Sequence, residues 1–195
     1  MSNEIKTKLF YLFLGVMFIG LSLSAQSKKK SLVFNEIYLN ESEPDESWLE
    51  IYNPSNNPLV LEKFRLYNVM TTNILPEEIR KNGGLEIAPG ESIILCANSA
   101  KLNLNNAKIK VIQISVLGSF GKGGFFSLRT KGMGENGVDI VRYGDPKLTV
   151  TLQNQIGDYV IPFSSDSQSY SRIDDHYSFI RSEPSPGIHI RKGGQ

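Results

Sequence analysis

The chain has 195 residues, of which 40% are hydrophobic and 21% are charged, with 21 basic and 20 acidic side chains. This composition is typical of one ordinary globular domain and argues against a multi-domain assembly, a coiled coil or a disordered scaffold. A net charge of +1 provides no overall field that would attract nucleic acid or an anionic membrane, so such partners would need a local basic patch.

The first 25 residues have the pattern of a secretory signal peptide. Lys6 and Lys8 precede an apolar run at residues 9–23, and small residues lead up to Ala25. The run is shorter than the roughly 20 residues that a membrane-spanning helix needs. We therefore expect cleavage between Ala25 and Gln26 and export of the chain to the periplasm, the cell surface or the medium, with no stable membrane anchor after cleavage. An uncleaved anchor is the alternative.

Cleavage would leave a neutral chain, with 19 basic (21 minus 2) and 19 acidic (20 minus 1) side chains. Residues 26–31 would form a short basic leader, residues 32–188 the folded domain and residues 189–195 a C-terminal tail. The single cysteine, Cys96, excludes an intramolecular disulfide. Its aliphatic neighbours indicate a small core residue.

From residue 31 onward, short runs rich in Val, Ile, Leu and aromatic residues alternate with clusters of Gly, Pro, Asn and Ser, a pattern that predicts many short strands. We expect strands at residues 32–39, 47–52, 59–67 with a break, 84–87, 92–97, 108–116, 125–130, 138–143, 148–153, 169–173 and 177–181. Helical signals are weak and confined to residues 75–80 and 99–105.

Several of these segments alternate between apolar and polar residues, so one face of each strand should be buried. Two sheets packed face to face are the simple way to bury such faces. The pattern therefore predicts an all-β fold, namely an immunoglobulin-like antiparallel β-sandwich. An all-β barrel is the alternative, because strand order cannot be read from the pattern.

Several short motifs, in the same order along the chain, resemble the lamin-tail domain family. They are F-N-E-I from residue 34, W-L-E-I-Y-N-P-S from residue 48, A-P-G from residue 88, V-D-I-V-R-Y from residue 138, S-R-I-D-D from residue 171 and P-S-P-G from residue 184. The residues that carry the signature are Asn35, Glu36, Trp48, Glu50, Tyr52, Asn53, Pro54, Pro89, Gly90, Arg172, Pro184, Pro186 and Gly187. The resemblance covers residues 32–188 and implies an immunoglobulin-like sandwich of the type found in nuclear lamins and in exported bacterial proteins.

Two glutamates of the signature are candidates for chemistry. Strict strand alternation places Glu36 on the face of Phe34 and Tyr38, and in-register pairing would bring it beside Glu50 among aromatic side chains. Such a pair, with Asp174, could be the centre of a small exported metal-dependent hydrolase or nuclease, which is the alternative function. We favour a structural role, in which each carboxylate accepts hydrogen bonds from the backbone or from an arginine. The arginine candidates are Arg65, Arg142 and Arg172.

Acidic residues also gather between the first two predicted strands. Glu43, Asp45 and Glu46 offer the hard oxygen ligands that Ca²⁺ prefers, although the spacing of an EF-hand loop is missing. We favour a solvated charge cluster, keep Ca²⁺ as the alternative, and expect no other cofactor.

Taken together, these patterns predict an exported, non-catalytic binding or structural module that interacts with a protein or a cell-envelope component. Nucleic acid is not expected as a partner, because the mature chain is neutral. DNA binding would require a cluster formed by the scattered lysines. Those lysines are Lys28, Lys29, Lys30, Lys108, Lys110 and Lys122.

Overall fold

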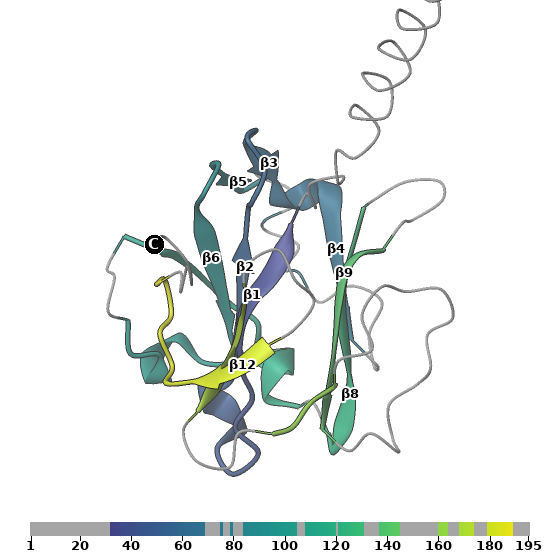
Figure 1. Cartoon of the computed structure of the whole chain (residues 1–195). Helices are drawn as coiled ribbons and strands as arrows, with labels where there is room; N and C mark the ends of the chain where they lie inside the picture. The colour runs from purple at the N-terminus through teal and green to yellow at the C-terminus, as the bar shows by residue number, and fades with distance from the viewer. Residues whose placement is uncertain are drawn as a thin grey trace, which may run out of the picture.

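The computed structural model in Figure 1 describes residues 32–68, 75, 79, 84–104, 108–119, 121–130, 137–144, 160–163, 168–173 and 179–188. The predicted signal peptide with Ala25 and Gln26, the predicted strand at residues 148–153 and Asp174 lie outside these residues. Within them, no helix has the length and apolar character needed to cross a membrane.

The larger of the sheets has six strands in the order β12-β11-β1-β2-β6-β7. Its strands are β1 (Val33–Tyr38), β2 (Trp48–Tyr52), β6 (Ser92–Cys96), β7 (Lys110–Gln113), β11 (Ser169–Arg172) and β12 (Phe179–Ser182). Strand β1 lies in the middle, between β2 and β11, so the N-terminal and C-terminal parts of the domain meet in one sheet.

The second sheet has four strands in the order β10-β9-β8-β4. The remaining described strands, β3 and β5, pair with each other in a two-stranded ribbon. These strands are β4 (Phe64–Asn68), β8 (Gly123–Thr130), β9 (Gly137–Gly144), β10 (Val160–Ile161), β3 (Leu59–Val60) and β5 (Glu86–Ile87). Among the described connections there are four short 3₁₀ turns, namely η1 (Pro44–Glu46), η2 (Leu61–Lys63), η3 (Ser99–Lys101) and η4 (Ser115–Gly118). Turn η2 is the break expected within residues 59–67.

The two main sheets stand face to face, with β1, β2 and β6 on one side and β4, β8 and β9 on the other (Figure 1). The predicted all-β sandwich is therefore confirmed. The expectation of purely antiparallel sheets is wrong at two places, because β6 pairs with β7 and β9 pairs with β10 in parallel. Parallel neighbours need a crossover connection, which the residues between β6 and β7 provide.

The main core fills the space between the sheets. Its fully buried side chains include Phe34, Leu49, Leu66, Phe126 and Tyr143. The rings of Phe126 and Tyr143 stack with centroids 4.9 Å apart. Burial of each such side chain contributes roughly 1.5–3 kcal/mol to folding.

A second, smaller cluster lies on the opposite face of the six-stranded sheet. Tyr38, Trp48, Ile94 and Cys96 are buried there, and the rings of Tyr38 and Trp48 stack with centroids 6.1 Å apart. The cluster is covered by apolar side chains of the crossover and of β7, which are Leu102, Leu104, Ile109 and Val111. We call this the outer face of the large sheet, and it is this face that carries the two signature glutamates.

Candidate functional site

A β-bulge at Asn35 sets the geometry of the candidate site. Phe34 pairs with Ile51 and Glu36 pairs with Glu50, so β1 has one more residue than β2 over this stretch. In such a bulge the two residues on the longer strand oppose one residue on the shorter strand. Asn35 and Glu36 therefore both lie beside Glu50.

The bulge corrects one prediction about the faces of β1. Phe34 packs in the core between the sheets together with Ile37, whereas Tyr38 stacks on Trp48 on the outer face. Glu36 thus shares a face with Tyr38 as predicted, but the predicted association with Phe34 is wrong. The extra residue shifts the alternation of side chains by one position.

Glu36 is fully buried and accepts three hydrogen bonds. Its Oε1 accepts from the Ser169 hydroxyl and from the backbone N–H of Ser185 at 2.9 Å, and its Oε2 accepts from the Ser185 hydroxyl at 2.9 Å. The Ser169 hydroxyl lies 3.0 Å from that of Ser182. Strands β11 and β12 thus supply a row of hydroxyl groups beside this carboxylate.

Glu50 is also fully buried. Its Oε1 accepts from the Asn35 side-chain amide at 3.0 Å and from the Ser92 hydroxyl at 2.7 Å, and its Oε2 accepts from the backbone N–H of Gly187 at 2.8 Å. Each of the four carboxylate oxygens in the pair therefore accepts a hydrogen bond from the chain itself.

The donors Ser185 and Gly187 belong to the C-terminal P-S-P-G motif. The Ile188 N–H donates to the Ser185 carbonyl at 2.9 Å, which closes a four-residue turn with Pro186 and Gly187 at its centre. Gly187 has φ of +83°, which a type II turn requires at that position and which glycine adopts without strain. After β12 the segment runs along the side of the large sheet that faces away from the small sheet (Figure 1).

Burial controls the protonation of the two glutamates. Loss of solvation raises the pKa of Glu36, although hydrogen bonds from Ser169 and Ser185 oppose the shift. Loss of solvation, helped by the charge of Glu36, raises the pKa of Glu50 to about 7. Hydrogen bonds from Gly187, Ser92 and Asn35 again oppose the shift. The pair is therefore poised to hold a proton near neutral pH.

Arg172, a predicted partner of the glutamates, lies on the opposite side of the sheet and forms a buried ion pair with Asp139. The Arg172 Nε donates to the Phe34 carbonyl at 2.7 Å, and Asp139 accepts from the Phe34 N–H at 2.9 Å. This pair connects β1 and β11 of the large sheet with β9 of the small sheet. The described hydrogen bonds of the glutamates come instead from serine, asparagine and backbone groups.

The signature turns after β2 and before β6 pack against each other. The Asn53 side-chain amide donates to the carbonyls of Asn57 and Ile87 at 2.8 and 2.9 Å, and its N–H donates to the Glu91 carbonyl at 3.0 Å. Gly90, with φ of +77°, donates to the Asn53 carbonyl at 2.9 Å. In the sequence, Pro54 follows Asn53 and Pro89 precedes Gly90. Tyr52 pairs with Ser92 next to these turns.

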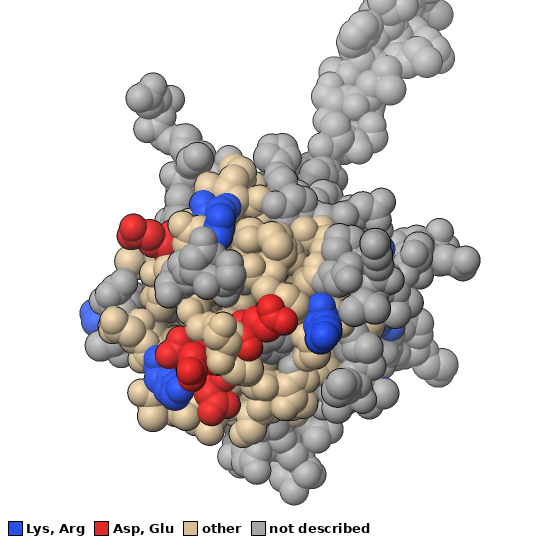
Figure 2. All heavy atoms as spheres, turned by 90° about the horizontal axis from the view of Figure 1, so that it is seen from below, with Lys and Arg blue, Asp and Glu red and all other residues tan. Residues whose placement is uncertain are grey.

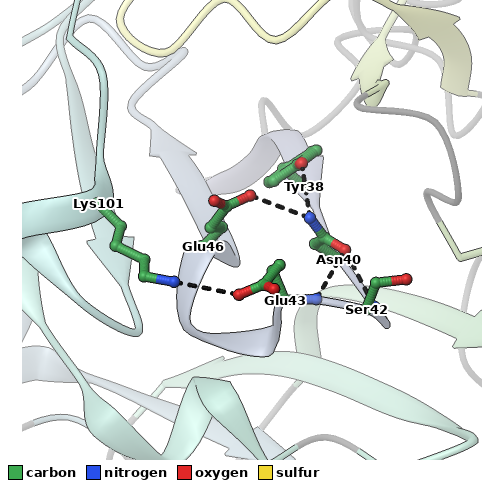
Figure 3. A network of polar contacts seen from close by, with 6 residues as sticks. All are labelled: Tyr38, Asn40, Ser42, Glu43, Glu46 and Lys101. Atoms are coloured by element: carbon green, nitrogen blue, oxygen red, sulfur yellow. Dashed lines mark hydrogen bonds and ion pairs between the residues drawn. The ribbon is translucent and has the colours of Figure 1, made fainter.

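The acidic loop forms a separate network (Figure 3). Asn40 donates to the Tyr38 hydroxyl and to Glu46, and it accepts from the backbone N–H groups of Ser42 and Glu43. The Glu43 side chain forms an ion pair with Lys101, with 3.1 Å between Nζ of the lysine and Oε2 of the glutamate. The carboxylates of Glu43 and Glu46 therefore have different partners.

Figure 2 views this end of the molecule, where acidic side chains gather with basic side chains beside them. Asp45 lies in η1, beside Gly118 of η4. In the part of the chain that the structure describes, no three His, Cys, Asp or Glu side chains are grouped so that they could hold a metal ion.

The three predicted lysine candidates that the structure describes lie on or beside different elements. Lys110 belongs to β7 at the edge of the large sheet and donates to the Glu86 carbonyl at 3.0 Å, and Lys108 precedes it. Lys122 precedes β8 of the small sheet. Lys28, Lys29 and Lys30 lie outside the described residues.

Sequence reasoning missed Asp139 and the three serines that donate to the glutamates, Ser92, Ser169 and Ser185. One signal was available for Ser169, because Ser169 and Ser171 alternate with Tyr170 and Arg172 and so place two small hydroxyls on one strand face. The other donors follow from pairings between distant segments.

No protein-family model matches the chain, and a search of curated proteins finds no relative. The resemblance to lamin-tail domains therefore stays a prediction that rests on the motifs.

Proposed function

We propose that the chain is an exported, lamin-tail-like and immunoglobulin-like domain that acts as a non-catalytic binding or structural module. Its partner would be a protein or another component of the cell envelope. The observation that carries the proposal is the use of Glu36 and Glu50, the two strongest candidates for chemistry, to hold the C-terminal turn against the sheet.

A catalytic carboxylate must present a lone pair to a substrate, a water molecule or a metal ion. Glu36 and Glu50 are fully buried, and all four of their oxygens accept hydrogen bonds from the chain. The same bonds join the N-terminal strands to the last described residues. This arrangement favours a structural role for the pair over the hydrolase alternative.

The remaining surface would then carry the function. A neutral mature chain favours partners that are recognised by shape and hydrogen bonding over partners that are recognised by charge. Protein and envelope components fit this requirement better than nucleic acid does.

The test has two arms in one preparation. The full chain is expressed with its N-terminal segment, and the exported fraction is analysed by intact mass spectrometry and by binding to envelope fragments. We expect a mature N-terminus at Gln26, saturable binding to the fragments and no hydrolysis of nucleic acid or phosphoesters with Mg²⁺, Mn²⁺ or Ca²⁺.

Glu50→Gln and Glu46→Gln are the matched variants, since they make the same change in a buried and in a loop carboxylate. A metal-dependent hydrolysis that disappears only in a folded Glu50→Gln protein would support the hydrolase instead. An exported protein that still begins at Met1 would contradict the predicted cleavage.

A further inference from the structure

Strand β7 forms one edge of the large sheet. In the part of the chain that the structure describes, its one strand neighbour is β6, to which it runs parallel. The Ile114 N–H donates to the Cys96 carbonyl at 2.7 Å, and alternate residues of a parallel strand direct their backbone groups to opposite sides. Ile112 and Ile114 therefore bond toward β6, whereas the N–H and C=O groups of Val111 and Gln113 point away from the sheet.

The side chains of β7 are apolar in the middle of the strand and polar at its ends. Val111 packs against the cluster on the outer face and Ile112 packs against the main core, but both are only half-buried. Lys110 and Gln113 are exposed. On the neighbouring strand β6, residues 93–96 are all buried. The edge of the sheet thus leaves apolar surface that one further strand would cover.

We propose that β7 is the interface of a homodimer, in which the β7 strands of two copies of this chain pair antiparallel across a two-fold axis, with the two Ile112 residues opposite each other. The large sheets of the two copies would then form one continuous sheet. This inference goes beyond the proposed function, because it involves neither export nor an envelope component.

The register follows from the direction of the backbone groups. Val111 and Gln113 are the residues of β7 with outward groups, so we place Val111 of one copy opposite Gln113 of the other. Residues opposite each other in a hydrogen-bonded antiparallel pair exchange both of their backbone bonds. The two-fold axis repeats this pair, so every outward group of β7 finds a partner. A register centred on Val111 would instead place Gln113 opposite Ile109, which lies outside β7.

The side chains fit the same register. The two Ile112 side chains would meet on the face of the main core, and Val111 would lie beside Gln113 on the outer face. Lys110, the charged residue of β7, would lie opposite Ile114, so like charges do not face each other across the pair. A net charge of +1 also opposes association of two copies only weakly.

Strand β7 lacks most of the features that protect exposed edges. Proteins commonly block such edges with proline, with several charged side chains or with a β-bulge. The sequence of β7 contains no proline, its pairing with β6 is regular, and its one lysine is the first residue of the strand. Because the strand is short, the interface is small, and we expect a reversible dimer.

Sedimentation equilibrium and NMR-detected amide exchange of the purified mature chain test the dimer together. We expect the weight-average mass to rise from the monomer value toward twice that value between about 20 µM and about 1 mM. Over the same range the exchange rates of the Val111 and Gln113 N–H groups should fall in proportion to the remaining monomer. The Ile114 N–H, which bonds to β6, should keep its rate.

Two results of these measurements would overturn the proposal. One is a mass that stays at the monomer value over the whole range. The other is a dimer in which the exchange rates of Val111 and Gln113 do not change, because such a dimer uses another surface.

Val111→Pro and Val111→Ala are matched variants of the interface. Proline removes the outward N–H without removing a bond to β6, whereas alanine keeps this donor. We expect Val111→Pro to stay monomeric, and Val111→Ala to dimerise with a dissociation constant within about tenfold of wild type. Dimerisation of Val111→Pro as strong as that of Val111→Ala would contradict pairing through β7. If the proline variant does not fold, the wild-type exchange rates still decide the matter.

Discussion

Asp139 and Arg172 illustrate how single residues complete the sandwich. Together they satisfy the N–H and the carbonyl of Phe34, which lies beyond the pairing of β1 with β11 at Glu36 and Ile37. The ion pair thus takes the place of a strand partner for β1. It also joins the two sheets, because Asp139 belongs to β9.

We expect Asp139→Asn to lower the free energy of unfolding by about 3–5 kcal/mol, because it leaves the Arg172 cation buried without its counter-charge. Urea denaturation at pH 7 measures the change. The control is Glu43→Gln, which breaks the exposed pair with Lys101 and should leave the free energy of unfolding nearly unchanged, because solvent screens an exposed ion pair. A loss as small in Asp139→Asn as in the control would show that the buried pair does not hold the sheets together.

The sequence allowed the pairing of Glu36 with Glu50 to be anticipated, because both lie in strongly patterned strands that are neighbours along the chain. The bulge at Asn35 was not predicted, because an alternating pattern with a period of two does not show where a strand contains one extra residue. The donors of Ser185 and Gly187 escaped it as well. They come from a segment 137 to 149 residues away, and only the folded chain brings them to the glutamates.

At the scale of elements, the junction between β2 and β3 depends on one side chain. Asn53 is fully buried, donates to two carbonyls and accepts from the N–H and the hydroxyl of Ser55. It thereby fixes the turn after β2 and connects it to β5 through Ile87. A proline follows directly, which ends the strand because proline lacks the donor that would continue the ladder.

Asn53→Ala should therefore reduce the free energy of unfolding by about 2–3 kcal/mol, since it leaves the Ile87 carbonyl buried without this donor. Asn57→Ala makes the same chemical change at an exposed side chain four residues later and should stay within about 0.5 kcal/mol of wild type. Thermal or urea unfolding of both variants provides the comparison. Equal effects would mean that the Asn53 side chain is not what fixes the turn.

Strands with clear alternation or a continuous apolar run, and with good turn residues at their ends, were predicted close to their observed positions, as β2, β6 and β9 illustrate. Strand β10 was not predicted, because its two residues give no periodic signal and no longer apolar segment surrounds them. The parallel pairings of β7 and β10 could not be predicted, because strand order depends on contacts between segments that are not adjacent in sequence.

At the scale of the whole molecule, the central strands β1, β2 and β6 of the large sheet are buried on both faces. The main core lies between the sheets, and the crossover between β6 and β7 covers the cluster around Trp48 and Ile94 on the outer face. In a simple sandwich that outer face would be solvated. The domain thus has two apolar cores that share one sheet.

Ile94→Ala tests the second core, because Ile94 is fully buried on the outer face. We expect a loss of about 2–4 kcal/mol in the free energy of unfolding, comparable to that of Leu49→Ala in the main core. Lys110→Ala, at an exposed position of the neighbouring strand β7, should change it by less than about 0.5 kcal/mol. A result for Ile94→Ala close to that of Lys110→Ala, from the same urea titrations, would contradict a second core.

The position of β1 in the middle of the large sheet has a consequence for how the chain reaches its native state. Its partners include β11, and Glu36 receives its serine hydroxyl from a residue 133 positions later. Contacts of such high sequence separation slow folding, because a long loop must close before they form. Strand β1 is made early during synthesis, whereas its partner β11 is made near the end. The domain can therefore complete its fold only after most of the chain has been made.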